Sequence, residues 1–144
     1  MNQGALTLTD SVLKQNVSDA AGGGIHSIGA LTVSRSSFLN NSGGQTGGGI
    51  YQVGGQSTIE NCIFTRNIAN NGGGLSNLSS TMNVIGSLFS ANTAVEQRGG
   101  IFGYQFNDPI HLHMTVTNTT VTGNQALFGE VWRWRTRSSL SSIT

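Results

Sequence analysis

Apolar and polar residues alternate along this chain in short runs, and the runs return at intervals of about 25 residues. Within a run the apolar positions are two apart, as at Leu6/Leu8 and Leu31/Val33, with a polar residue between them. A spacing of two places side chains on one face of a β-strand. A fixed period of this length is typical of a solenoid, in which each repeat forms one turn of a coil.

Each repeat contains the same phrase: an apolar residue, a bulky apolar residue five places on, and an asparagine three places after that. The five copies are Leu8/Leu13/Asn16, Val33/Phe38/Asn41, Ile59/Phe64/Asn67, Val84/Phe89/Asn92 and Val116/Val121/Asn124. A glycine run that ends in an aliphatic residue follows each of the first four asparagines, at Gly22–Ile25, Gly47–Ile50, Gly72–Leu75 and Gly99–Ile101. These runs disfavour helix and suit tight corners, where glycine tolerates a positive φ.

The pattern predicts an all-β fold, a single-stranded parallel β-helix of about five rungs of about 25 residues, with three short strands in each rung. Each strand pairs with its counterpart one turn away, so equivalent residues stack roughly 4.8 Å apart. We expect one internal stack of phenylalanines and one corner stack of asparagines, because like side chains stack favourably in this geometry. The expected members are Phe38, Phe64 and Phe89, and Asn16, Asn41, Asn67, Asn92 and Asn124.

The stretch from Phe64–Asn67 to Gly72–Leu75 resembles the repeats of polymorphic outer-membrane proteins and related bacterial surface proteins, and Phe89–Asn92 with Gly99–Ile101 is similar. The resemblance covers roughly residues 5–124. It implies a right-handed parallel β-helix of the pectin-lyase-like superfamily. It also implies an extracellular or outer-membrane-associated location, as in adhesin-like secreted bacterial proteins.

Composition limits the function further. Net charge is +1 and only 9% of the residues are charged, which excludes a broad basic surface for nucleic acid. The single cysteine, Cys62, excludes an internal disulfide, and we expect it to be a small residue packed at a bend. The chain carries no secretory-signal pattern and no apolar run long enough for a membrane span. No cofactor or metal motif is present in the sequence.

An enzyme of the superfamily, such as a pectate lyase, polygalacturonase or uronate epimerase, needs clustered carboxylates. The six acidic residues are spread along the repeats and form no visible pair of carboxylates, so the sequence favours a module without catalytic activity. The one irregular interval, from Val84 to Val116, holds an insertion at about 103–113. Its Asp108, His111 and His113 are weak catalytic candidates, and Asp-Pro-Ile-His is similar to an interrupted form of the Asp-Pro-His-Asp of uronate epimerases.

A second candidate site lies on the outside of the predicted coil. His26, Tyr51, Ser76 and Phe102 each follow the aliphatic residue that closes a glycine run, so by alternation they point outward. Tyr51, Phe102 and Tyr104 are therefore weak ligand-binding candidates, because exposed aromatic rings can stack on sugars or on a partner protein.

The sequence divides into a repeat domain at 1–131 and a tail at 132–144 that breaks the pattern. The tail is either a terminal cap or an out-of-frame end. We expect an extracellular or cell-surface module for structural or adhesion-type binding, part of a larger surface protein. Its expected partners are a carbohydrate, a host or cell-surface protein, and the remaining rungs of the parent protein. The alternative is a polysaccharide lyase, hydrolase or epimerase with its catalytic rungs elsewhere or at the 103–113 loop.

Overall fold

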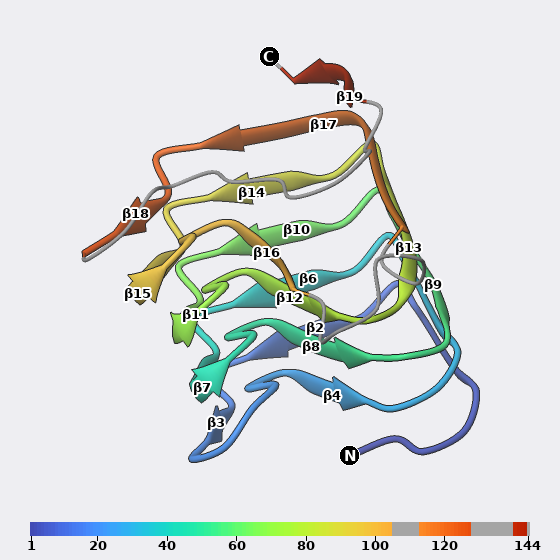
Figure 1. The fold of residues 1–144 in the computed structure, drawn as a ribbon, viewed down its shortest axis with the longest axis horizontal. Helices are drawn as coiled ribbons and strands as arrows, with labels where there is room; N and C mark the ends of the chain where they lie inside the picture. Colours follow the sequence, from blue (N-terminus) through green and yellow to red (C-terminus); the bar gives the residue numbers. More distant parts are fainter. Residues whose placement is uncertain (105–112, 128–139, 144) are drawn as a thin grey trace.

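The computed structural model describes residues 1–104, 113–127 and, for the backbone alone, 140–143. These residues form a coil of short strands in which every pairing between strands is parallel (Figure 1). The predicted parallel β-solenoid with rungs of about 25 residues is confirmed, since register partners such as Leu6 and Leu31 lie one repeat apart. The five copies of the phrase make about four turns rather than five, because four turns separate the first strand from the fifth in the order β1-β5-β9-β13-β17.

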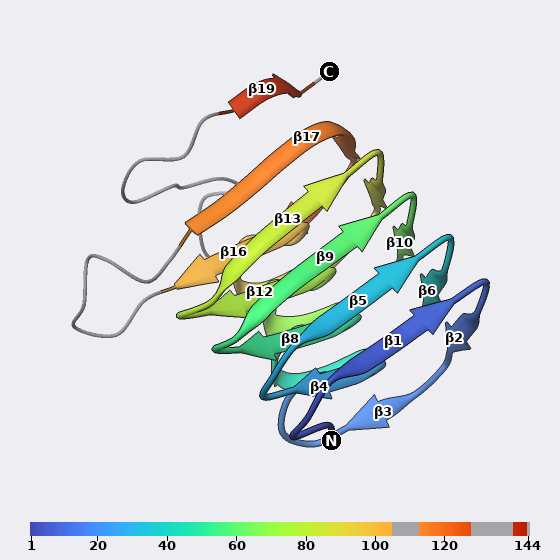
Figure 2. The ribbon, with the colours of Figure 1, turned by 90° about the vertical axis from the view of Figure 1, so that its right-hand side faces the viewer.

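Two columns of strands join into one large sheet (Figure 2). The first column carries the first apolar residue of each phrase, and the second carries the bulky one. The first column is β1 (Leu6–Thr9), β5 (Leu31–Ser34), β9 (Gln56–Glu60), β13 (Thr81–Ile85) and β17 (His113–Thr122). The second is β2 (Val12–Lys14), β6 (Ser37–Leu39), β10 (Ile63–Thr65) and β14 (Leu88–Ser90). β17 spans both columns and pairs with β13 and β14, which connects them.

The second sheet follows the asparagine corner, and the third follows the glycine runs. The second sheet contains β3 (Val17–Ser18), β7 (Ser42–Thr46), β11 (Ile68–Asn71), β15 (Thr93–Gln97) and β18 (Gln125–Ala126). The third contains β4 (Ile25–Ser27), β8 (Ile50–Val53), β12 (Leu75–Leu78) and β16 (Ile101–Tyr104). The coil has three parallel sheets, but the short strands after the asparagines were not predicted, so each of the first four rungs has four strand segments where three were expected.

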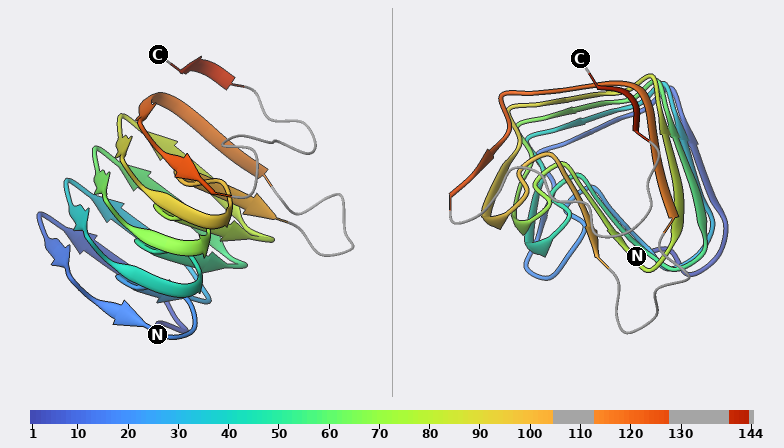
Figure 3. Two further views of the ribbon diagram at one scale, coloured as in Figure 1. Left: turned by 90° about the vertical axis from the view of Figure 1, so that its left-hand side faces the viewer. Right: turned by 45° about the horizontal axis from the view of Figure 1, so that its top comes forward.

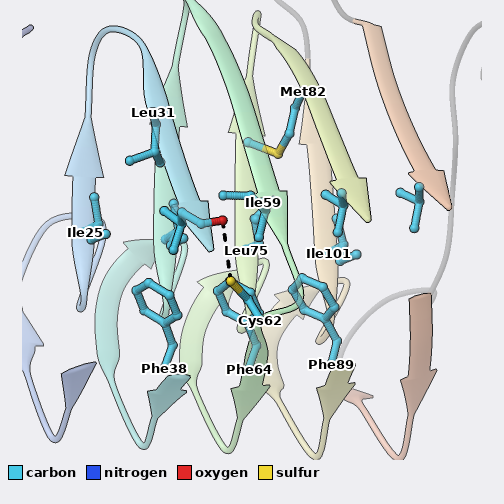
Figure 4. Close-up of a cluster of buried hydrophobic side chains, with 14 of the residues drawn as sticks. Ile25, Leu31, Phe38, Ile59, Cys62, Phe64, Leu75, Met82, Phe89 and Ile101 are labelled. Carbon is cyan, nitrogen blue, oxygen red and sulfur yellow. Dashed lines mark hydrogen bonds between the residues drawn. The ribbon is translucent and has the colours of Figure 1, made fainter. Parts of the chain in front are cut away.

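The interior is filled by stacked apolar side chains (Figure 4). Phe38, Phe64 and Phe89 are completely buried, and their rings lie almost parallel, with centroids 4.7 and 4.4 Å apart. This spacing follows from the register of β6, β10 and β14, because paired parallel strands place equivalent side chains directly above one another.

The asparagine corner is a continuous chain of side-chain hydrogen bonds. The backbone N–H and the Nδ2 of Asn67 both donate to Oδ1 of Asn92, each at 2.9 Å. Nδ2 of Asn67 also donates to the carbonyl of Phe38 at 2.9 Å, so one side-chain amide makes hydrogen bonds to both the preceding and the following turn. Asn16, Asn41, Asn92 and Asn124 take part in the same chain.

A second chain of side-chain hydrogen bonds crosses the bend between the first two strand columns. The hydroxyl of Ser36 donates to the carbonyl of Ser34 at 2.8 Å and accepts the Ser11 N–H at 3.1 Å. Cys62 occupies the equivalent position, where its thiol donates to the carbonyl of Glu60 at 3.2 Å. Burial raises the pKa of the Cys62 thiol, which disfavours the reactive thiolate.

Beyond β17, the backbone of β19 (Leu140–Ile143) continues the first sheet by parallel pairing with β17. Residues 128–139 lie outside the described residues, so the domain boundary near 131 and both interpretations of the tail stay predictions.

Candidate functional site

A groove of about 220 Å³ lies on the outside of the coil, where the third sheet meets the turns of β7 and β11. In the right-hand view of Figure 3 these turns project from the coil beside the strands of the third sheet. The third sheet contributes one wall, and the projecting turns contribute the other. The lining residues are Gln45, Thr46, Tyr51, Asn71, Ser76, Leu78, Phe102 and Tyr104.

The glycine runs produce the concave shape. Gly47 has a φ of +65°, and a Cβ there would lie 2.3 Å from the carbonyl oxygen of Ile50. Gly48 approaches the next turn so closely that a Cβ would lie 2.3 Å from the carbonyl oxygen of Gly73. The left-handed backbone favours glycine at the first position, and the close contact requires it at the second, so the chain can fold back sharply and leave an inward corner at these turns.

Aromatic side chains line the wall formed by the third sheet. Tyr51, Ser76 and Phe102 are register partners on β8, β12 and β16, so the two aromatic residues lie two rungs apart. Two rungs correspond to roughly 10 Å. Phe102 also lies beside Tyr104, with ring centroids 6.1 Å apart and planes inclined by 12°. Ser76, between the two aromatic positions, is almost completely buried.

The row of rings continues along the coil from Tyr51 to His26, and the centroids of these two rings lie 5.0 Å apart. Burial lowers the pKa of His26, with a smaller contribution from the N-terminal amino group, so the imidazole stays neutral near pH 7. Burial raises the pKa of the Tyr51 phenol. Both rings therefore present uncharged, amphipathic surfaces.

Hydroxyl and amide groups line the opposite side of the groove. The Thr46 hydroxyl donates to the Ser76 hydroxyl at 2.6 Å, which links the two walls. Nδ2 of Asn71 donates to a Glu96 carboxylate oxygen at 3.1 Å, so the amide is held in one orientation. None of the described residues that line the groove carries a charge. Such a lining can stack on flat apolar faces and exchange hydrogen bonds with hydroxyl groups.

The catalytic candidates are only partly described. Asp108 and His111 lie outside the described residues, so their arrangement stays a prediction. His113 is exposed at the start of β17, where its Nε2 is 3.5 Å from the Thr115 hydroxyl. Within the described part of the chain, no group of three His, Cys, Asp or Glu residues could hold a metal ion. No helix formed by the described residues is long and apolar enough to cross a membrane.

Two of the described carboxylates, Asp10 and Glu96, are each hydrogen-bonded to one other side chain. Asp10 accepts a bidentate hydrogen bond from Arg35 at 2.8 and 2.7 Å, and this bond lowers the pKa of the Asp10 carboxyl. Glu96 accepts from Asn71. Neither arrangement is a pair of carboxylates for acid–base catalysis.

Comparisons with family models, with curated proteins and with solved structures find no match to this chain. The parallel β-solenoid therefore rests on the structure alone. The resemblance to polymorphic outer-membrane protein repeats, and with it the pectin-lyase-like superfamily, stays a hypothesis.

The structure brings the three outward aromatic candidates, Tyr51, Phe102 and Tyr104, to one groove. Sequence reasoning did not find the second wall of that groove. Its residues precede the glycine runs, as Gln45-Thr46 precedes Gly47 and Asn71 precedes Gly72. The available signal was the glycine run itself, since a stacked glycine column marks the place where a coil bends inward.

Proposed function

We propose that this chain is an extracellular or cell-surface binding module, and that the groove holds an uncharged carbohydrate chain. The observation that carries the proposal is the combination of aromatic rings and neutral hydrogen-bonding groups in one concave site. The surface location is supported by the resemblance of the repeats to bacterial surface proteins.

The aromatic spacing supports an extended sugar chain. Tyr51 and Phe102 lie two rungs apart on one face, with the small Ser76 between them. An extended chain of β-linked hexoses that runs along the coil would place alternate rings over Tyr51 and Phe102. Sugar rings bury their C–H faces on aromatic side chains, and their hydroxyls need partners at the rim.

The polar wall supports an uncharged ligand. Gln45, Thr46 and Asn71 offer amide and hydroxyl groups and no ionic partner. A polyuronate would place carboxylates among uncharged lining residues, which costs desolvation energy. The described cation beside the lining is Arg98, whose guanidinium lies against the Phe102 ring. Neutral sugars carry no such desolvation cost.

The scaffold supports binding without rearrangement. β8 and β12 pair on both sides, whereas β16, which carries Phe102 and Tyr104, pairs with β12 alone among the described strands. A preformed site keeps the entropic cost of binding low, which matters for ligands that gain little energy per contact.

The test is calorimetric titration of the whole chain with xylo-, cello- and manno-hexaose, compared with oligogalacturonate. We expect one neutral hexaose to bind, and its affinity to change little between low and high salt, because no ion pair is formed. Tyr51→Ala and Phe102→Ala should each weaken binding about tenfold or more, since stacked aromatic anchors dominate such sites. Ile63→Ala is the matched control, because Ile63 is an exposed apolar residue on β10, a strand that does not line the groove.

Two outcomes would contradict the proposal. The first is equal affinity for a neutral hexaose in the parent, Tyr51→Ala and Phe102→Ala chains. The second is tighter, salt-sensitive binding of oligogalacturonate, which would favour the polysaccharide-enzyme alternative.

A further inference from the structure

One rung departs from the glycine rule that shapes the groove. The residues that open the first three glycine runs are Gly22, Gly47 and Gly72, with φ values of +66°, +65° and +60°. In the next rung the same position is Arg98, because Gln97 is the register partner of Asn71. Arg98 keeps the positive φ, at +56°.

An arginine in this conformation is costly. A non-glycine residue in the left-handed region costs about 1–3 kcal/mol. Ten described non-glycine residues adopt it in this chain, Arg35 and Arg66 among them, so Arg98 is distinguished by replacing a glycine and not by its φ alone. Glycine at Arg98 would fit the corner as it does in the three preceding rungs. The left-handed backbone of this corner therefore does not require an arginine.

The arginine side chain contacts the aromatic wall of the groove. The guanidinium carbon of Arg98 lies 4.8 Å from the centroid of the Phe102 ring, in cation–π geometry. Phe102 also stands over Gly72 of the preceding rung, where a Cβ would lie 2.7 Å from the Phe102 Cβ. Arg98 and Tyr104 both lie beside the ring, and the ring lines the groove.

We propose that Arg98 is a positioning residue of the groove: its guanidinium fixes the orientation of the Phe102 ring that stacks on the ligand, at the expense of backbone strain. The inference rests on the proposed function for its effect on affinity. Its effect on the ring itself is independent of any ligand.

Two substitutions separate the strain from the contact. Arg98→Gly removes the guanidinium and relieves the backbone, whereas Arg98→Ala removes the guanidinium and keeps a Cβ at positive φ. Both should weaken binding of the neutral hexaose by about two- to fivefold, the value of one exposed cation–π contact. Arg98→Gly should nevertheless melt about 2–4 °C above Arg98→Ala, because relief of strain exceeds the added freedom of the unfolded chain. Arg98→Lys should recover part of the affinity, since an ammonium keeps the charge but not the planar stack.

The ligand-free readout is the ring of Phe102 in nuclear magnetic resonance spectra of the whole chain with labelled phenylalanine. Its signals are assigned by their loss in Phe102→Leu. We expect the ring signals to shift and the ring to flip faster in Arg98→Gly and Arg98→Ala, while the signals of the buried Phe38, Phe64 and Phe89 stay unchanged.

The outcomes distinguish the two proposals. If Phe102→Ala weakens binding but Arg98→Gly and Arg98→Ala bind like the parent, the role of Arg98 is wrong and the groove stands. If no hexaose binds and the ring signals still change, the carbohydrate function is wrong and Arg98 still orients Phe102. Unchanged ring signals in both variants overturn the positioning role whatever the affinity.

Discussion

Substitution of Phe64 by alanine tests the internal stack most directly. Phe64 is completely buried between Phe38 and Phe89, at ring distances of 4.7 and 4.4 Å. Truncation of a buried phenylalanine costs about 3–5 kcal/mol. We expect the upper part of this range, because the change removes two aromatic contacts worth about 0.5–1.5 kcal/mol each. The melting temperature should fall by roughly 8–20 °C.

The matched control is Arg66→Ala. Arg66 is exposed two residues further along the chain and has a φ of +53°. Alanine also carries a Cβ, so the substitution leaves the backbone strain in place and removes only an exposed side chain. The cost should be under about 0.5 kcal/mol. Phe64→Leu provides an intermediate case, since it keeps most of the apolar volume but loses the stacked ring.

The assay is urea denaturation of the three variants and the parent, followed by circular dichroism at one protein concentration. The reasoning requires a large loss for Phe64→Ala, a smaller loss for Phe64→Leu and almost none for Arg66→Ala. Comparable losses for Phe64→Ala and Arg66→Ala would refute the inward position of Phe64 and the register of the rungs with it.

Four further predictions concern single groups and the chemistry of the whole chain. Nε2 of the buried Gln52 donates to two backbone carbonyls at 2.7 and 2.6 Å, so Gln52→Glu should cost about 3 kcal/mol at pH 7. Burial would raise the folded pKa of the new carboxyl above its unfolded value, so the urea midpoint should recover as the pH falls toward about 4; an equal loss at pH 7 and pH 4 would contradict this. The lowered pKa of His26 means that the unfolded state takes up the proton first, so stability should fall as the pH drops below about 6.5. In His26→Gln this step should be absent from melts recorded between pH 7 and 5, and its persistence would assign it to another group. Cys62→Ser should change stability by less than about 1 kcal/mol, because a hydroxyl can replace the thiol bond to a backbone carbonyl; a loss above about 2 kcal/mol would show that sulfur packing dominates. The purified chain should not degrade polygalacturonate or alginate, and turnover that disappears when Asp108, His111 and His113 are changed to alanine would establish a catalytic loop.

The architecture could be predicted because every turn of a solenoid repeats the same sequence pattern. Once Val33, Ile59 and Val84 are recognised as equivalent, the parallel register follows, and the structure pairs these three residues in that order. Asn41 and Asn67 could be assigned to one corner for the same reason. A fold held together by distant and dissimilar segments offers no such internal comparison.

The short strands after the asparagines could not be predicted in the same way. Ser42–Thr46 reads Ser-Gly-Gly-Gln-Thr, a composition typical of a loop, yet it forms β7 between β3 and β11. Its strand conformation comes from pairing with neighbouring turns, not from propensity. Tertiary context of this kind overrides local preference in β-structure more than in helices.

The groove was only half predictable. Alternation along the third sheet places Tyr51 and Phe102 outside, but it does not show that a second wall faces them. That wall depends on the direction in which the chain leaves each glycine corner, and this direction is a backbone property with no side chain to reveal it. Thr46 and Asn71 became site residues only through that geometry.

The same glycines close the coil and shape the groove, and this coupling limits where binding specificity can change. A Cβ at Gly48 would collide with the carbonyl of Gly73, so a substitution there damages the packing of two turns as well as the site. The outward positions of β8, β12 and β16 lie outside the stacked core, although Ser76 is buried and a Cβ at Gly72 would lie 2.7 Å from the Phe102 Cβ. Tyr51, Ser76 and Phe102 can therefore differ from rung to rung while the turns stay nearly identical. Arg98 connects the glycine corner with the outward positions. It is the one described residue that replaces the first glycine of a run, and its guanidinium lies against the Phe102 ring.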